Sequence, residues 1–126
     1  SNTINSKIIV LDFYYTSCGP CILDIRNLVK LDSLFNDSDV CFIGINVADN
    51  DISRMQKFLI DRKIKYKNVY EGNDLANKYG FRGFPQILFI DSETNEILHH
   101  STGCRSDGFE YYKNLLEGFL EKENGK

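Results

Sequence analysis

The sequence predicts an α/β domain in which helices flank a mixed central β-sheet. Strand-sized apolar runs alternate with segments of helical periodicity, which is typical of a layered α/β domain. The last two predicted strands are joined by a short polar turn and form an antiparallel hairpin, so the sheet is expected to be mixed. The chain has 126 residues, 42% of them hydrophobic, and this suits a single domain over residues 1–126.

The first half of the chain predicts a strand, a crossover helix and a second strand. Residues 7–14 (KIIVLDFY) form a nearly continuous apolar run, which predicts a strand buried on both faces. Helical spacing then extends from Pro20 to about Phe35, and a proline is tolerated in the first turn because its missing N–H would have no partner there. Residues 40–47 (VCFIGINV) repeat the strand pattern, so the two strands are expected to be parallel.

The second half predicts two further helices, a short extended piece, a hairpin and a closing helix. Asp and Asn side chains accept hydrogen bonds at helix starts, and glycine commonly ends helices, so these residues mark the limits. In chain order, the elements are a helix after Asn50-Asp51, an extended piece near 66–70, a helix from Asn73 to Gly80, strands over 86–91 and 96–100, and a helix over 106–120.

The charge and apolar patterns argue against two classes of function. The net charge of −3 and the scattered basic residues disfavour nucleic-acid binding, which calls for a basic face. The apolar runs are strand-sized and too short to cross a membrane. The first residues, Ser1-Asn2-Thr3, lack the basic and apolar regions of a signal peptide, and because the chain starts without Met this leaves the compartment open.

The chemistry is expected at Cys18-Gly19-Pro20-Cys21, at the junction between the first strand and the first helix. Cys18 would lie at the helix N-terminus, where free N–H groups and the helix dipole favour a thiolate and lower its pKa. The thiolate is the nucleophile in thiol–disulfide exchange, so Cys18 is predicted to attack. Cys21 lies one turn later, within bonding distance, and is predicted to resolve the mixed disulfide.

Three alternatives to this redox interpretation are a structural zinc site, a copper-binding module such as a chaperone, and an interaction module whose disulfide is merely structural. A structural zinc site usually needs a second pair of ligands at matching spacing. No such pair is available, because Cys41 lies in a predicted buried strand, Cys104 in a loop, and His99 and His100 alternate across a strand. The spacing beside a βαβ unit favours a redox pair, with no metal or cofactor expected.

Two segments and an insert resemble those of a known family. Residues 11–21 (LDFYYTSCGPC) resemble the thioredoxin segment VDFWAxWCGPC, and residues 79–85 (YGFRGFP) resemble its YGIRGIP segment. Residues 52–70 resemble the helix-plus-strand insert of the TlpA/ResA type. Over about residues 7–120, the chain therefore resembles the thioredoxin superfamily, and most closely the TlpA/ResA-like thiol–disulfide oxidoreductases.

The resemblance implies a thioredoxin-like fold and a substrate-binding surface beside the cysteines. In the family, a cis peptide bond precedes the matching proline, here Pro85, and the backbone of the preceding residue, here Phe84, meets an extended substrate segment. Gly19 and Pro20 are expected to belong to the same surface. Ser17 replaces the family's tryptophan, so the apolar rim around the first cysteine should be smaller.

Two acidic residues are further candidates that the resemblance suggests. Asp12 occupies the position of the family's buried acid and, through a raised pKa, is expected to take the proton from Cys21 during resolution. Gly44 stands where thioredoxins have a lysine near this acid, so Asp12 is expected to lack that partner. Asp49 matches an active-site acid of ResA-type relatives, although capping of the next helix explains it equally well.

The predicted function is that of a thiol–disulfide oxidoreductase that reduces protein or small-molecule disulfides. Electrons would come from a partner reductase or a membrane thiol donor, and the protein is expected to be a monomer without a cofactor. The TlpA-like insert favours an extracytoplasmic location, with the cytoplasm as the alternative. Relatives carry additional N-terminal elements, so the chain is expected to be a trimmed domain or the C-terminal module of a longer protein.

Overall fold

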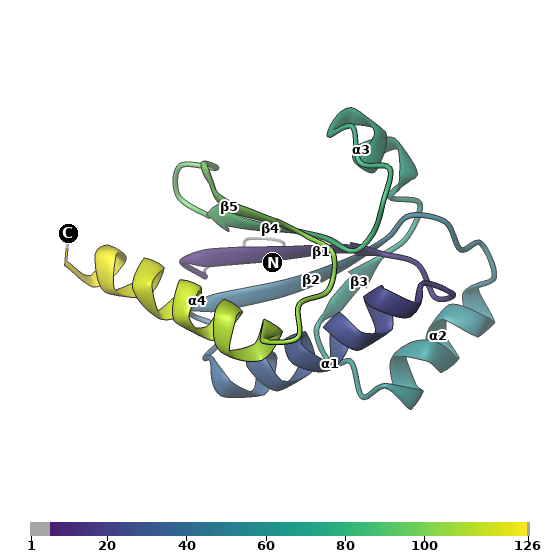
Figure 1. Cartoon of the computed structure of the whole chain (residues 1–126), viewed down its shortest axis with the longest axis horizontal. Coiled ribbons are helices and arrows are strands. Elements are labelled where there is room, and N and C mark those ends of the chain that lie inside the picture. Colours follow the sequence, from purple (N-terminus) through teal and green to yellow (C-terminus); the bar gives the residue numbers. More distant parts are fainter. Residues whose placement is uncertain (1–5, 126) are drawn as a thin grey trace.

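The computed structural model describes residues 6–125 as a five-stranded sheet flanked by helices (Figure 1). The strand order is β3-β2-β1-β4-β5. β1 is parallel to β2 and antiparallel to β4, so the sheet is mixed, as predicted. The strands are β1 (Ile8–Tyr14), β2 (Val40–Asn46), β3 (Lys67–Val69), β4 (Gln86–Asp91) and β5 (Ile97–Thr102).

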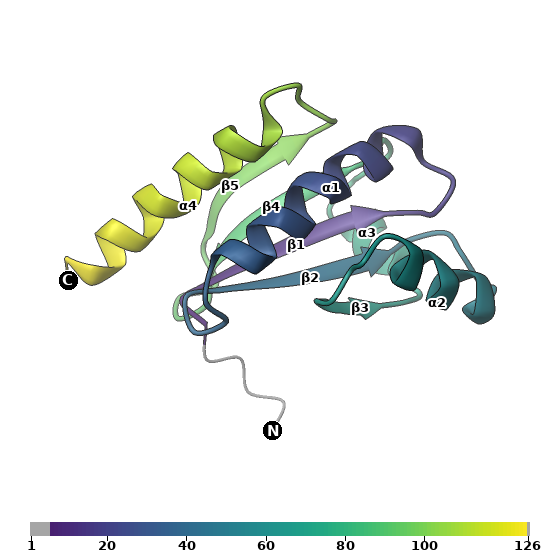
Figure 2. The same cartoon turned by 90° about the horizontal axis from the view of Figure 1, so that it is seen from below.

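The helices are distributed unequally over the two faces of the sheet. In Figures 1 and 2, the helices over Gly19–Leu34, Ile52–Asp61 and Gly108–Asn124 lie on one face, and the short helix over Asn73–Lys78 lies on the other. Among residues 6–125, no helix combines the length and the apolar character needed to cross a membrane. The helices are α1 (Gly19–Leu34), α2 (Ile52–Asp61), α3 (Asn73–Lys78) and α4 (Gly108–Asn124).

The core consists of clusters on both faces of the sheet. Beneath α1 and α4, residues such as Val10, Leu28 and Tyr112 are almost completely buried together. Beneath α3, Phe13 and Ala76 form a smaller cluster. Because β1 and β2 are parallel, their C-terminal ends meet at one edge of the sheet, and α1 begins at that edge.

The face under α3 is covered only at one end, which corrects two expectations. The apolar run predicts a β1 buried on both faces, and the second strand predicts Cys41 in the core. Cys41 is instead half-buried, as are Ile9 and Leu11. α3 has six residues and covers Phe13 and Ile45 near the ends of their strands, so earlier residues on this face stay partly exposed.

Three element limits also differ from the sequence-based prediction. α4 continues to Asn124 instead of ending near 120, because the polar residues there include good helix formers and polarity alone does not end a helix. β5 extends to Thr102. Asn73 is the first residue of α3, and the cap position is Gly72, with no side-chain hydrogen bond to the helix.

Candidate active site

Cys18 and Cys21 lie where β1 leads into α1, and they are joined by a disulfide. Cys18 caps the helix, since its Sγ accepts a hydrogen bond from the backbone N–H of Cys21 at 3.2 Å. Pro20 lies in the first turn, where its missing N–H leaves no bond unmade. The structure thus places both predicted cysteines at a helix N-terminus, whose N–H groups favour a thiolate.

The two cysteines differ in their access to solvent. Cys21 is completely buried, whereas Cys18 is 4% exposed and is followed by the exposed residues Gly19 and Pro20. The Sγ of Cys18 lies 3.7 Å from the carbonyl oxygen of Phe84. A sulfur atom arriving from solvent therefore meets Cys18 first.

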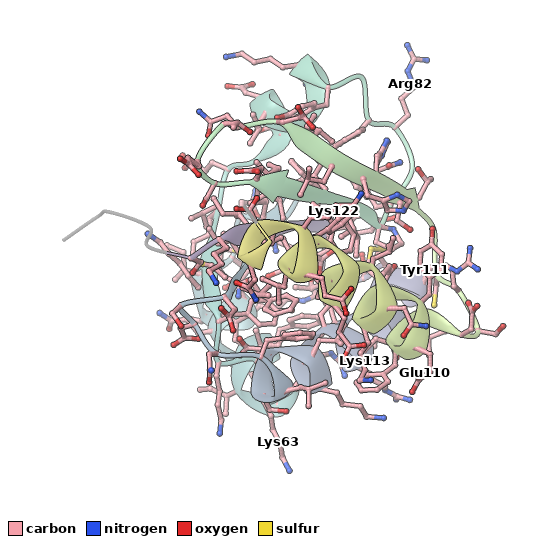
Figure 3. All side chains as sticks on the ribbon, turned by 90° about the vertical axis from the view of Figure 1, so that its left-hand side faces the viewer. Lys63, Arg82, Glu110, Tyr111, Lys113 and Lys122 are labelled. Carbon is pink, nitrogen blue, oxygen red and sulfur yellow. A yellow bond between two sulfur atoms is a disulfide. The ribbon has the colours of Figure 1, made fainter. Side chains whose placement is uncertain are left out.

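The loop before β4 forms the other side of this entrance. The Phe84–Pro85 peptide bond is cis, as the resemblance implies, and Pro85 accepts a backbone hydrogen bond from Gly103 at 3.0 Å. The ring of Phe84 meets that of Tyr15 edge-on, with centroids 6.0 Å apart. Beside them is a cavity of about 430 Å³, and Figure 3 shows Arg82, at its rim, extending outward. The surface next to the cysteines is thus aromatic with one cation at its edge.

Asp12 lies in the middle of β1, in register with Gly44 of β2. It is 2% exposed, and neither carboxylate oxygen has a hydrogen-bond partner among residues 6–125. Burial, and after it the charge of Asp24, raise the pKa of Asp12 well above its usual range. A Cβ at position 44 would overlap the side chain of Asn68, so the place of the family's lysine is occupied. Within the described part of the chain, the acid therefore has no cation partner that offsets its burial.

Asp24 is a second buried acid, and sequence analysis missed it. It lies in α1 one turn after Cys21 and is completely buried. The hydroxyl of Tyr112, from α4, lies 3.1 Å from both of its carboxylate oxygens and donates to them. Burial raises the pKa of Asp24 to about 6, although hydrogen bonds from Tyr112 and Asn27 oppose the shift. Asp24 follows Cys21 by three positions, which places both on one helix face, and this spacing could have identified Asp24 as a candidate from the sequence.

Asp49 ties two loops together and does not cap α2. Its carboxylate accepts hydrogen bonds from the N–H and hydroxyl of Thr16, at 2.7 and 2.6 Å, and from the amide of Asn46 at 2.9 Å. Partial burial raises its pKa, but these hydrogen bonds outweigh it and the net pKa is lowered. The cap of α2 is Asp51. Asp49 therefore stays ionised and anchors the turn that leads into Cys18.

Comparison with known proteins agrees with this geometry. A family model described as Redoxin matches residues 1–116. The chain belongs to the Redoxin family. In this family its relatives include the thiol-disulfide oxidoreductase ResA of Halalkalibacterium halodurans, 22% identical over 90% of this chain and 65% of the relative. ResA of Bacillus thuringiensis is 23% identical over 94% of this chain and 65% of the relative, so the chain spans just under two thirds of these curated relatives.

Solved structures confirm the fold of this Redoxin-family chain. A Chlorobium tepidum protein described as the thiol:disulfide interchange protein DsbE superimposes with a TM-score of 0.81 at 20% identity, over 93% of this chain and 82% of that one. The fold is thioredoxin-like, and the resemblance to the TlpA/ResA-like members of that superfamily is confirmed.

The other cysteine and histidine candidates are not part of the disulfide. His99 contacts the hydroxyl of Tyr111 at 3.0 Å, whereas His100 contacts the side chain of Gln86 at 2.6 Å, so the two rings point to opposite faces, as predicted. Cys104 is an exposed free thiol. Within residues 6–125 of this Redoxin-family domain, no group of three or more His, Cys, Asp or Glu side chains is placed to hold a metal ion.

Proposed function

We propose that this domain is a thiol–disulfide oxidoreductase whose Cys18–Cys21 couple reduces disulfides. The observation that carries the proposal is a disulfide at the N-terminus of α1, in which Cys21 is completely buried and Cys18, 4% exposed, precedes the exposed residues Gly19 and Pro20. The helix N–H groups stabilise a thiolate at Cys18, which makes it the attacking group. Membership of the Redoxin family and likeness to proteins named thiol-disulfide oxidoreductase support the same chemistry.

The reaction needs two exchange steps and no cofactor. The thiolate of reduced Cys18 attacks one sulfur of the substrate disulfide, which forms a mixed disulfide and releases the first substrate thiolate. Cys21 then loses its proton and attacks the Sγ of Cys18. The disulfide of the domain forms again, and the second substrate sulfur leaves as a thiolate. A donor dithiol, from a reductase or a membrane protein, returns two electrons to the domain.

Asp12 accepts the proton of Cys21 in the second step. Cys21 is completely buried and has no route for its proton directly to solvent, so a buried base is required. Asp12 lies on the face of β1 that packs under α1, and its raised pKa brings its proton affinity nearer to that of a thiol. A carboxylate without donors is a stronger base than a hydrogen-bonded one, which favours Asp12 over Asp49 for this role.

The substrate binds as an extended segment across the loop before β4. Phe84 lies next to the Sγ of Cys18 and has a half-buried ring, so its backbone can pair with a substrate strand while its side chain contacts apolar groups. Pro85 shapes this loop, and the exposed residues Gly19 and Pro20 leave the approach open. These features suit a protein disulfide or a small-molecule disulfide.

The cellular setting forms part of the proposal. The α2–β3 insert of the TlpA/ResA type favours an extracytoplasmic location over the cytoplasm. We place residues 1–126 as a single monomeric domain.

The reduction potential of the pair tests the proposed function. The measurement uses a variant with Cys41→Ser and Cys104→Ser, so that the site pair is the one couple that titrates. We expect a reversible two-electron transition near the value of thioredoxin, about −270 mV, for a reductant. A value near about −180 mV would indicate an isomerase or oxidase instead. The absence of a reversible transition would contradict the proposal.

Trapping the mixed disulfide tests the order of attack. With Cys21→Ser, the first step can occur and the second cannot, so a covalent adduct with a disulfide substrate should accumulate at Cys18. With Cys18→Ser, in a protein that also carries Cys41→Ser and Cys104→Ser, no adduct should form at neutral pH, because Cys21 is buried. Copper and zinc analysis of the reduced protein serves as the control against the metal-binding alternative, and stoichiometric metal would contradict the redox assignment.

A further inference from the structure

Asp12 lies opposite the first turns of α1 and beside Asp24. Side chains alternate along a strand, so Val10, Asp12 and Tyr14 point to the same face of β1. Tyr14 packs with Cys21, and Val10 belongs to the cluster that α1 and α4 build farther along the strand. Asp12, between these two contacts, therefore faces the turn of α1 that carries Asp24.

α4 supplies the hydrogen-bond partner of Asp24. Gly108 is buried where α4 passes α1, and a Cβ there would crowd the amide of Asn27 and lie 3.6 Å from Oδ1 of Asp24. The glycine keeps the two helices close, and one turn later Tyr112 places its hydroxyl 3.1 Å from both oxygens of Asp24. Asp24 is thus supplied with donors, whereas Asp12 has none among the described residues.

Among residues 6–125, no Lys or Arg side chain forms an ion pair with either acid. The ion pairs found among residues 6–125 all lie elsewhere on the surface. The titratable side chains around the two acids are tyrosine hydroxyls and a cysteine thiol. These groups are neutral when protonated and negative when deprotonated, so they cannot supply a positive charge. The titratable groups that act on the pair are Tyr14, Tyr66 and Tyr112 around Asp12, and Tyr66, Tyr112 and Cys104 around Asp24.

We propose that Asp24 and Tyr112 are positioning residues that control when Asp12 holds its proton. The hydroxyl of Tyr112 keeps Asp24 as the charged member of the pair, and that charge keeps the proton on Asp12, which has no donor. Two neighbouring carboxyls in a poorly solvated interior do not ionise independently, and the first charge goes to the acid with hydrogen-bond donors. The inference rests on the proposed function, in which Asp12 is the base for Cys21.

The pair sets the pH range in which the second exchange step is fast. Asp12 must be ionised before it can take the proton of Cys21, so the step accelerates as the pH rises through the pKa of Asp12. The charge of Asp24 moves that range to higher pH and at the same time makes Asp12 a stronger base. α4, which carries Tyr112, is in this way linked to the chemistry at the start of α1.

The test is a carbon-13 NMR titration of aspartate carboxyls in the oxidised protein, where Cys18 and Cys21 do not titrate. We expect Asp24 to titrate at a lower pH than Asp12. Asp24→Asn should lower the titration midpoint of Asp12 by about one pH unit or more, because it removes a neighbouring like charge. Tyr112→Phe should raise the midpoint of Asp24, because the charged form loses its donor.

Two matched variants serve as controls. Tyr111→Phe removes the neighbouring hydroxyl, which contacts His99 and not the acids, and Asp32→Asn removes another acid of α1. Both should leave the midpoints of Asp12 and Asp24 unchanged. An unchanged Asp12 midpoint in Asp24→Asn, or an unchanged Asp24 midpoint in Tyr112→Phe, would overturn the inference. The readout needs no substrate, so it is independent of whether the domain proves to reduce disulfides.

Discussion

Two regions adjoin the cysteine pair, and each holds carboxylates in a different environment. The core under α1 holds Asp12, which has no hydrogen-bond donor among residues 6–125, and Asp24, which has donors from Tyr112 and Asn27. The loop after β2 holds Asp49, which accepts three hydrogen bonds. The pKa of Asp12 is raised well above the usual range and that of Asp24 is raised to about 6, whereas the pKa of Asp49 is lowered.

The comparison shows that donors, as well as burial, decide what an acid near the disulfide can do. Asp12 and Asp49 both lose hydration when the protein folds. The hydrogen bonds to Asp49 compensate for this loss and keep its carboxylate charged. Nothing compensates Asp12, so its proton is held more tightly. Asp12 is suited to proton transfer, and Asp49 is suited to holding the turn before Cys18.

The largest expected effect is a difference between Asp12 and Asp49 variants in the rate of the resolving step. Asp12→Asn should slow the resolving step about 100-fold at pH 8, the scale of general base catalysis, and the difference should shrink at low pH, where the wild-type acid is already protonated. Asp49→Asn should leave the same step nearly unchanged. Stopped-flow kinetics of mixed-disulfide resolution measures both. Equal slowing in the two variants would remove the functional distinction.

The next effect concerns stability and has a defined sign. Asp12 binds its proton more tightly in the folded protein, so the wild type loses stability as the pH rises from the ordinary carboxyl pKa through the raised one. Asn does not titrate, and Asp12→Asn should therefore be more stable by roughly 1–3 kcal/mol at pH 8. Denaturant unfolding at pH 3 and pH 8 checks this. A gain of equal size at both pH values would show that titration is not its cause.

Asp49→Asn should change stability in the opposite direction. Its lowered pKa means that the ionised form stabilises the fold above the ordinary carboxyl pKa and that this stabilisation is lost as the pH falls through the lowered value. The variant should lose about 1 kcal/mol at pH 7, a modest amount because the carboxylate is half-buried. The same unfolding series measures it, and a loss that persists at pH 2 would speak against the carboxylate as the source.

The smallest effect isolates one hydrogen bond of the Asp49 anchor. Thr16→Val keeps the branched shape and the backbone N–H bond but removes the hydroxyl that lies 2.6 Å from Asp49. We expect a loss of about 0.5–1 kcal/mol. Thr16→Ser keeps the hydroxyl and should regain most of it. If Thr16→Val is as stable as the wild type and Thr16→Ser is not, packing of the methyl group and not the hydrogen bond is responsible.

The sequence predicted the features that depend on neighbouring residues. The order of strands and helices, the disulfide pair at the start of α1 and the cap at Asp51 all follow from local patterns, because caps and helix starts involve residues within one turn. The resemblance added the cis bond before Pro85 and the position of Asp12. The limits of α4 and β5 were less well predicted, since polar residues do not by themselves end an element.

Burial on the second face of the sheet could not be predicted from the apolar runs alone. The apolar sequences of β1 and of the strand that contains Cys41 suggest full burial. Burial on the face under α3, however, depends on how far α3 extends over these strands. A six-residue helix covers just the ends of two strands. The length of an element elsewhere in the chain therefore decided the exposure of Cys41.

By itself the sequence determined where the sulfur chemistry lies, because Cys18 and Cys21 need no more than a strand-to-helix junction to form their pair. The tertiary structure alone decided how the acids around them behave. Tyr112 reaches Asp24 across 88 positions and Thr16 reaches Asp49 across 33. A carboxylate's pKa depends on the donors and charges that packing brings to it, and an acid on a helix gives no sign of a tyrosine that approaches from another helix.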